Sequence, residues 1–343
     1  MIETVAICVA CGRKDFFRFH TYWECQSCGH RYQCVKGIPK LYIEENVGRV
    51  DQHLRDQLYN GLLGRFYNLL MPLLSLPARP LKLSFWLWSL YFLLLFFILF
   101  LLFHITQWAI IRQLSDSSWI DGLIFLFFLG SIFFFRQHPY IWYLIILAIP
   151  VKLSLTFRRF KPPKSFSEVH NNFQAEYRNL QKRIRILDVA TGSCNSLYRH
   201  GWMELNADYA GIDLSEMMLL KGADFMTHKS IRIDFAFADS HQLPFETNSF
   251  DIVTCYGAVN GYTNISKAMS EMVRVTSRGG KILFLDEQLY IGANFLEKLY
   301  FESVLSNHDV VKHCPVEMLP SNVESVDVHQ VYHFYYICTL RKK

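Results

Sequence analysis

A long uncharged run constrains the fold of this chain more than any other feature. Residues Leu83–Ile111 contain no Asp, Glu, Lys or Arg. As a helix, about 29 residues extend about 43 Å at roughly 1.5 Å per residue, which exceeds the roughly 30 Å hydrocarbon core of a bilayer. Because a helix that is apolar on all sides over such a length is rarely buried in a soluble domain, the run predicts one tilted membrane span.

A second apolar stretch follows the first. Residues Gly122–Val151 carry a single full charge, Arg136. Basic residues stand on both sides of the apolar zone, namely Arg79, Lys82, Lys152, Arg158, Arg159, Lys161 and Lys164. Since Lys and Arg mark the cytoplasmic ends of membrane helices, both ends are expected on the cytoplasmic side. We therefore expect a multi-pass insert at 83–157 with two spans, the second at about Trp119–Phe135, and with Tyr140–Phe157 in the interface.

Two matched cysteine pairs lie near the N-terminus, Cys8-x-x-Cys11-Gly12 and Cys25-x-x-Cys28-Gly29. Two residues between sulfurs allow both thiolates to reach one tetrahedral metal, and a following glycine permits the tight turn of each pair. The segment Met1–Ala10 is too short and too acidic for a signal peptide, so reduced thiols are expected. The spacing predicts a zinc ribbon over residues 1–46 with a closed, structural zinc site.

The rest of the chain divides by pattern. Residues 47–82 have helical periodicity and form a predicted helical lid or linker. The prolines in Phe160–Lys164 disfavour helix and indicate a linker before a domain at 165–343. That domain alternates predicted strands with predicted helices, which are Ile184–Val189, Tyr209–Asp213, Ser215–Met226, Ile231–Ala238, Phe250–Tyr256, Ile265–Val275 and Lys281–Asp286.

This alternation predicts an α/β fold with a mostly parallel sheet. At the end of the chain, Val323–Val328 and Val331–Leu340 follow each other after a short connection. They predict an antiparallel hairpin at one edge of the sheet.

Four elements in order suggest a cofactor site. The first strand ends in Asp188-Val189-Ala190-Thr191-Gly192, a small-residue turn that lets the backbone approach a ligand closely. The second strand ends in Asp213, which is placed to accept the hydroxyls of a ribose or to cap the next helix. The third and fourth elements are Asp239-Ser240 with Leu243-Pro244-Phe245, and Glu271-Met272-Val273-Arg274-Val275 with Gly279-Gly280.

This series resembles the class I S-adenosylmethionine-dependent methyltransferases, especially the methyltransferase type 11 group that contains the ubiquinone/menaquinone C-methyltransferases. The resemblance covers about Arg183–Glu287 and implies a Rossmann-like sheet. It implies that Asp188, Ala190 and Gly192 shape the pocket for the methionine part, and that Asp213 binds ribose. It also implies that Leu214 borders the adenine, that Asp239 and Ser240 bind it, and that Tyr256 and Gly257 face the sulfonium. The chain departs from the family pattern at Cys194, Asn195 and Asn260.

Methyl transfer is an in-line displacement in which the protein mainly orients and desolvates the reactants, so no diagnostic catalytic triad is expected. Candidates for the acceptor side are Tyr256, Asn260, Tyr262 and His241, although His241 fits a surface loop equally well. Tyr59-Asn60 and Tyr67-Asn68 are eight residues apart and share one face of a helix. They indicate either a helix that covers the cofactor, as in related enzymes, or an aromatic packing stripe.

Three functions remain open from the sequence. The first is a membrane-bound methyltransferase of a small, lipid-soluble acceptor. The second is an RNA methyltransferase whose ribbon, with Arg13, Lys14, Arg18 and Arg31, grips nucleic acid; the net charge of +5 does not demand such a partner. The third is a non-catalytic scaffold that binds the cofactor or a partner protein. The sequence does not identify the acceptor or the oligomeric state.

Overall fold

The computed structural model describes residues 1–61, 64, 164–302 and 311–343. The chain separates into two compact units, residues 1–74 with 160–343 and residues 75–159, and every described residue belongs to the first. The predicted membrane insert at 83–157 and the pair Tyr67-Asn68 lie outside the described residues. Within the described ranges, no helix has the length and apolar character needed to cross a bilayer.

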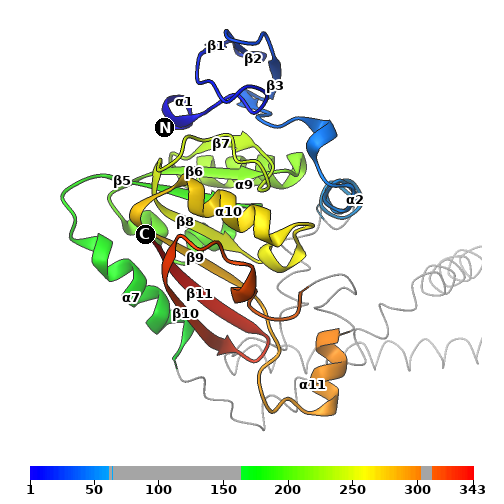
Figure 1. Cartoon of the computed structure of the whole chain (residues 1–343), viewed down its shortest axis with the longest axis vertical. Helices are drawn as coiled ribbons and strands as arrows, with labels where there is room; N and C mark the ends of the chain where they lie inside the picture. Colours follow the sequence, from blue (N-terminus) through cyan, green and yellow to red (C-terminus); the bar gives the residue numbers. More distant parts are fainter. Residues whose placement is uncertain (62–63, 65–163, 303–310) are drawn as a thin grey trace, which may run out of the picture. The chain divides into compact units, whose positions relative to one another are not determined.

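The described strands of the main domain form a seven-stranded sheet with the order β10-β11-β9-β8-β5-β6-β7 (Figure 1). Strands β5, β6, β7, β8 and β9 pair in parallel, and the closing hairpin adds β10 and β11 antiparallel to them. The strand bounds are β5 Ile184–Val189, β6 Ala207–Asp213, β7 Asp234–Phe237, β8 Phe250–Tyr256, β9 Thr276–Glu287, β10 Val323–Tyr332 and β11 Tyr335–Lys342. The predicted α/β fold with an antiparallel edge hairpin is confirmed.

The sequence placed most of these elements correctly. The predicted bounds of β5, β8 and helix α10 coincide with the observed ones, whereas β7 starts at Asp234 rather than at Ile231. The predicted break after Val328 was wrong, because β10 continues to Tyr332 and turns at His333 and Phe334. The polar residue Gln330 stays inside the strand, since its side-chain nitrogen donates to the backbone oxygen of Gln288 at 2.9 Å.

Helices connect the strands and cover the sheet. Their bounds are α7 Phe166–Arg178, α8 Asn195–Arg199, α9 Glu216–His228, α10 Ile265–Val275 and α11 Phe295–Tyr300, with short 3-10 turns η4 Trp202–Glu204, η5 Val259–Gly261 and η7 Val316–Met318. Side-chain hydrogen bonds cap the first turns of several of these helices. For example, the Ser215 hydroxyl accepts from the Met218 N–H at 3.2 Å at the start of α9.

The N-terminal segment forms a small antiparallel sheet with the order β1-β2-β3-β4. Its elements are α1 Ile2–Val5, β1 Phe16–Arg18, β2 Tyr22–Cys25, β3 Arg31–Val35 and β4 Ile38–Pro39. They are followed by η1 Glu44–Asn46, α2 Arg49–His53 and the π-helical turn η2 Leu54–Tyr59. Gly12 and Gly29 have φ of +74° and +72°, so each cysteine pair ends in the left-handed turn that its glycine predicted.

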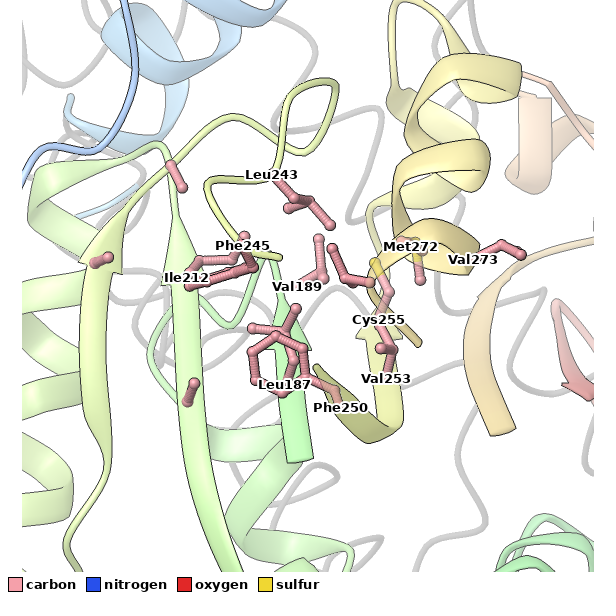
Figure 2. Close-up of a cluster of buried hydrophobic side chains, with 14 of the residues drawn as sticks. Leu187, Val189, Ile212, Leu243, Phe245, Phe250, Val253, Cys255, Met272 and Val273 are labelled. Carbon is pink, nitrogen blue, oxygen red and sulfur yellow. The ribbon is translucent and has the colours of Figure 1, made fainter. Parts of the chain in front are cut away.

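One hydrophobic cluster joins the N-terminal segment to the main sheet. It runs from the buried ribbon residues Trp23, Tyr32 and Leu41 to the side chains of β5, β6 and β8. Leu243 and Phe245, from the Leu-Pro-Phe sequence, lie in this cluster beside Val189 and Ile212 (Figure 2). The ribbon and the α/β domain therefore share a core.

A charged pair on α10 holds the loop that carries Leu243 and Phe245. The Arg274 guanidinium donates to the backbone oxygens of Phe245 and Leu243 at 2.6 and 2.8 Å. The Glu271 carboxylate accepts from the Leu243 N–H at 2.8 Å and pairs with Arg274 at 2.6 Å. Because these bonds use charged partners and backbone groups, they fix the path of the loop from Asp239 to Glu246, here called the 239–246 loop.

Helix α9 makes a close backbone contact with the turn after β5. A Cβ added at Gly222 would lie 2.7 Å from the Gly192 oxygen and 2.8 Å from the Cys194 sulfur. We expect Gly222→Ala to push α9 off the turn and to lower the free energy of unfolding by about 1–3 kcal/mol, the usual cost of overpacking. Denaturant unfolding measures the effect. The exposed neighbour Asp224→Ala serves as the control and should change stability by less than about 0.5 kcal/mol. An unchanged stability of the Gly222 variant would contradict the close packing.

Candidate functional site

A cavity of about 180 Å³ lies at the carboxyl ends of β5, β6, β7 and β8. Parallel strands end at the same edge of a sheet, which is where open α/β folds bind ligands. Its lining combines strand ends with part of the N-terminal helical segment, namely Asp51, Leu54, Arg55, Tyr59, Val189, Ala190, Gly192, Ile212, Asp213, Leu214, Ser215, Met218, Ala238, Asp239, Ser240, Tyr256, Gly257, Ala258, Gly261 and Tyr262. The cavity thus brings together eight of the nine residues predicted to bind the cofactor.

The turn after β5 is built from left-handed residues. Ala190, Gly192 and Cys194 have φ of +54°, +52° and +59°. The left-handed backbone at Gly192 aims its N–H at the second strand, where it donates to Asp213 Oδ2 at 2.8 Å. The small-residue turn predicted from sequence is therefore present, and its geometry depends on the carboxylate opposite it.

Asp213 sits at the centre of the polar lining. Its Oδ1 accepts from the Ser215 N–H at 2.8 Å, while Oδ2 accepts from Gly192. Burial raises the pKa of Asp213 to about 6, although hydrogen bonds from the backbone of Ser215, Gly192 and Leu214 lower it. The carboxylate thus binds the backbone before α9 and also lines the cavity, and its binding to ribose stays a prediction.

Asp188 lies behind the turn, outside the cavity lining formed by the described residues. Its carboxylate accepts from the hydroxyls of Thr191 and Thr254, each at 2.6 Å. Burial raises its pKa to about 6, and the two threonine hydrogen bonds lower it. Asp188 therefore supports the turn from within the core, whereas the sequence suggested direct pocket contact.

Asp239 also lines the cavity, and His241 is hydrogen-bonded to its carboxylate. The His241 backbone N–H and ring Nδ1 lie 2.9 and 2.8 Å from Asp239 Oδ1. The Asn264 N–H donates to the other ring nitrogen, Nε2, at 3.2 Å, so the proton sits on Nδ1 and that nitrogen donates to Asp239. Both bonds use Oδ1, and among the described residues none donates to Oδ2, which remains an acceptor for a ligand.

This placement changes the expectation for His241. The residue is buried between Asp239 and Asn264 and is not part of the described cavity lining. Its ring is hydrogen-bonded to Asp239, the predicted adenine-binding acid, and it does not line the part of the cavity proposed for the methyl acceptor.

Tyr256 lines the cavity with its ring, and buried groups engage its hydroxyl. Trp202 Nε1–H donates to that hydroxyl at 2.8 Å, and His170 Nε2 lies 3.2 Å from it. Burial lowers the pKa of His170 to about 3, so the imidazole is neutral near neutral pH. Burial also raises the pKa of Tyr256 well above its usual value, which keeps the phenol protonated near neutral pH.

The two remaining acceptor-side candidates differ in position. Tyr262 lines the cavity, and burial raises the pKa of its phenol well above the usual value. Asn260 lies outside the described lining. Its amide donates to the Glu287 oxygen at 2.7 Å and accepts from the Tyr336 hydroxyl at 2.9 Å, so it ties β9 to β11.

Sequence reasoning missed part of the lining. Asp51, Arg55 and Tyr59 reach the cavity from residues 49–60, here called the lid segment. Their spacing of four residues along one helical face is the signal that could have identified them. The Asn60 side-chain oxygen accepts from the Ser215 hydroxyl at 2.8 Å, which joins the segment to the start of α9. The predicted covering role of Tyr59-Asn60 agrees with this position.

The four predicted metal ligands also lie together. The sulfurs of Cys8, Cys11, Cys25 and Cys28 are all within 4.8 Å of one another. The Cys8–Cys28 and Cys11–Cys25 distances are 3.6 Å. Tetrahedral zinc with bonds of about 2.3 Å requires sulfurs about 3.8 Å apart, so the donor set fits that metal.

The raised pKa of Asp213 predicts a pH-dependent affinity for S-adenosylmethionine. An ionised carboxylate accepts ribose hydroxyls, whereas protonation removes an acceptor, so affinity should fall as pH drops below about 6 and level off above about 7. Calorimetric titration with S-adenosylhomocysteine between pH 5 and 8 measures this. Asp213→Asn should bind more weakly and lose the pH dependence, and a constant wild-type affinity across that range would contradict the assignment.

A matched pair of variants tests His241. Gln can replace the ring Nε2 that accepts from Asn264 but loses the donor to Asp239, while Asn places an amide nitrogen near the position of Nδ1. We expect His241→Gln to weaken S-adenosylhomocysteine binding about fivefold, for the loss of about 1 kcal/mol of hydrogen bonding, and His241→Asn to retain most of the affinity. Equal affinities for the two variants would remove the positioning role.

Known proteins resemble this chain over part of its length. Residues 187–284 match the methyltransferase domain family. The ubiquinone/menaquinone biosynthesis C-methyltransferase UbiE of Dinoroseobacter shibae is 32% identical over 104 residues, which are 30% of this chain and 42% of that protein. The demethylmenaquinone methyltransferase of Renibacterium salmoninarum is 36% identical over 99 residues, 29% of this chain and 39% of that protein. The chain spans about two fifths of the length of these relatives.

Among solved structures, the phosphoethanolamine N-methyltransferase 2 of Haemonchus contortus in complex with S-adenosyl-L-methionine has a TM-score of 0.41 and 16% identity, and covers 51% of this chain and 52% of that one. The PH0226 protein of Pyrococcus horikoshii has a TM-score of 0.39 and 16% identity, and covers 52% and 91%. Residues 187–284 are therefore similar to a known family of methyltransferase domains and to curated C-methyltransferases.

Proposed function

We propose that this chain transfers a methyl group from S-adenosylmethionine to a small, lipophilic acceptor at a membrane. The observation that carries the proposal is the cavity in which the glycine turn after β5, Asp213 at the end of β6 and Asp239 after β7 follow one another along the carboxyl edge of the sheet. The spacing of these groups along consecutive strand ends suits a ligand with a sugar, a base and an amino-acid tail.

The residues of the cavity fit this cofactor. Gly192 leaves room beside Asp213, since an added Cβ would be 3.9 Å from the carboxylate oxygen and 3.5 Å from the Met218 methyl group. Asp213 accepts from the ribose hydroxyls, and the free oxygen of Asp239 accepts from the adenine amino group. Bound S-adenosylmethionine supplies an electrophilic methyl group on sulfur.

The protein contributes orientation and exclusion of water. Tyr256 and Tyr262 line the cavity, and both phenols remain protonated because burial raises their pKa values. Neither is therefore a phenolate base at neutral pH. This arrangement favours an acceptor that needs little help with proton removal, and catalysis through positioning.

The membrane and the acceptor class rest on separate observations. The uncharged 83–111 run supports one membrane span, and the apolar stretch at 122–151 supports a second. Basic residues on both sides of this insert favour a cytoplasmic position for the ribbon and the catalytic domain. The curated relatives are named for ubiquinone and menaquinone biosynthesis. A pocket held beside a bilayer meets apolar acceptors at high concentration, so we infer a lipid-soluble, quinone-like acceptor.

A second candidate function keeps one specific observation in its favour. Phe17 and Phe19 on and beside β1 are 55% and 49% exposed. Arg18 lies over the Trp23 ring and Arg31 over the Tyr22 ring, each at 5.1 Å from the ring centre. Exposed aromatics beside arginines suit stacking on unpaired bases, so RNA remains the alternative acceptor.

Transfer of a labelled methyl group distinguishes these functions and the non-catalytic scaffold. We expect purified full-length chain in detergent to label the lipid extract of a membrane fraction and not total RNA, because the cavity is proposed to serve an apolar acceptor. Scintillation counting after phase separation measures the incorporation.

The controls use variants of α9 and the strand before it. Asp213→Ala should lose at least about tenfold in labelling because it removes a charged hydrogen-bond partner, while the exposed Asp224→Ala should label normally. Label only in RNA would favour the alternative, and cofactor binding without transfer to either fraction would favour the scaffold.

A further inference from the structure

The ribbon contacts the 239–246 loop directly beside its cysteine pairs. Val9 lies between Cys8 and Cys11, and its backbone oxygen accepts from the Gln242 side chain at 3.1 Å. The Ile7 N–H donates to the Pro244 oxygen and the Glu246 N–H donates to the Val5 oxygen, both at 2.9 Å. The loop that begins with Asp239 is therefore hydrogen-bonded along its length to the segment that enters the first cysteine pair.

The ribbon also binds the strand that leads into Asp239. The Leu41 N–H donates to the Phe237 oxygen at 2.8 Å, and Lys40 forms a parallel bridge with Phe237. Phe237 is the last residue of β7 and stands two residues before Asp239. The ribbon is thus hydrogen-bonded to the chain on both sides of Asp239, the predicted adenine-binding acid. It binds Phe237 before Asp239, and Gln242 and Pro244 after it.

The chain leaving the ribbon becomes the lid segment. Lys40 forms an ion pair with Glu216 at the start of α9. The Glu44 carboxylate accepts hydrogen bonds from both terminal nitrogens of the Arg55 guanidinium, at 3.0 and 2.6 Å. Because Arg55 lines the cavity, the end of the ribbon also positions the covering side of the pocket.

A buried phenol completes the cysteine site. The Tyr32 hydroxyl accepts from the Ala10 N–H at 3.3 Å and lies 3.1 Å from the Cys8 sulfur. Since its oxygen accepts from Ala10, its hydrogen is available to the sulfur, in the manner of the outer-shell donors that orient metal ligands. Tyr32 itself belongs to the hydrophobic cluster shared with Leu243 and Phe245.

We propose that the four-cysteine site is a positioning site for the cofactor pocket: zinc bound there fixes the ribbon, and the ribbon fixes Asp239 and the lid segment. This inference rests on the proposed cofactor binding. Without metal, the thiols are free to separate, and the loop loses the fixed backbone to which Gln242 and Pro244 are bonded. Because binding at two coupled sites is reciprocal, S-adenosylhomocysteine must tighten zinc binding by the factor by which zinc tightens the ligand.

The experiment measures both directions on the full-length chain in detergent. Calorimetry with S-adenosylhomocysteine compares the zinc-loaded protein with protein stripped by a chelator, and we expect roughly 5- to 150-fold weaker binding without zinc. On unmodified protein, a chromogenic chelator then competes for Zn²⁺ with and without S-adenosylhomocysteine. We expect the ligand to raise zinc affinity by the same factor, and circular dichroism of the stripped protein checks that it stays folded.

Two variants distinguish coupling between the zinc site and the cofactor pocket from general disruption of the fold. Cys34→Ser removes a ribbon thiol outside the cluster and should keep normal zinc content and ligand affinity. Gln242→Ala should keep its zinc but reduce the coupling factor, because it removes the link to Val9. Two results together would overturn the positioning role and leave the proposed function standing. The protein would bind S-adenosylhomocysteine equally well with and without zinc, and the ligand would not change the competition between the chelator and the protein for Zn²⁺. Failure of the zinc-loaded chain to bind S-adenosylhomocysteine would overturn both.

Discussion

The hydrogen bond from the Gly192 backbone to the Asp213 carboxylate is the contact on which the site depends. It joins the turn after β5, where Ala190, Gly192 and Cys194 all have left-handed backbone, to the tip of β6. Gly222 lets α9 approach the same turn from the other side. Burying a carboxylate is unfavourable, as its raised pKa shows, and a cofactor that donates hydroxyls would compensate part of that cost.

A second constraint acts on the 239–246 loop. The Glu271–Arg274 pair binds its backbone from α10, and the N-terminal segment binds it through Ile7 and Val9. Leu41 binds Phe237, the last residue of β7, just before the loop. His241 then orients the Asp239 carboxylate locally. The Leu-Pro-Phe sequence therefore has a structural role, because it provides the apolar side chains and the backbone groups that join the N-terminal segment, with its four clustered cysteines, to the sheet.

The sequence predicted what depends on local pattern. Strand β5, helix α10, the glycine turn and the cysteine cluster follow from periodicity, residue size and spacing, and Asp239 was placed at the site by the family resemblance. It did not predict contacts between distant segments: Asp188 supports the turn through Thr254, His241 faces Asp239, and Asn260 ties β9 to β11. The hairpin turn was misplaced because Gln330 is polar, and an edge strand accommodates a polar residue whose amide finds backbone partners. The insertion of Arg55 into the cavity, and the shared core of ribbon and sheet, likewise depend on tertiary packing.

The most direct test of the central claim is an experimental structure of the full-length chain with S-adenosylhomocysteine bound. The account predicts the ligand in the cavity at the carboxyl ends of β5, β6 and β7, with its ribose hydroxyls on the Asp213 carboxylate and its adenine amino group on Asp239. Ligand density at a different place, or a ribose that makes no contact with Asp213, would contradict it.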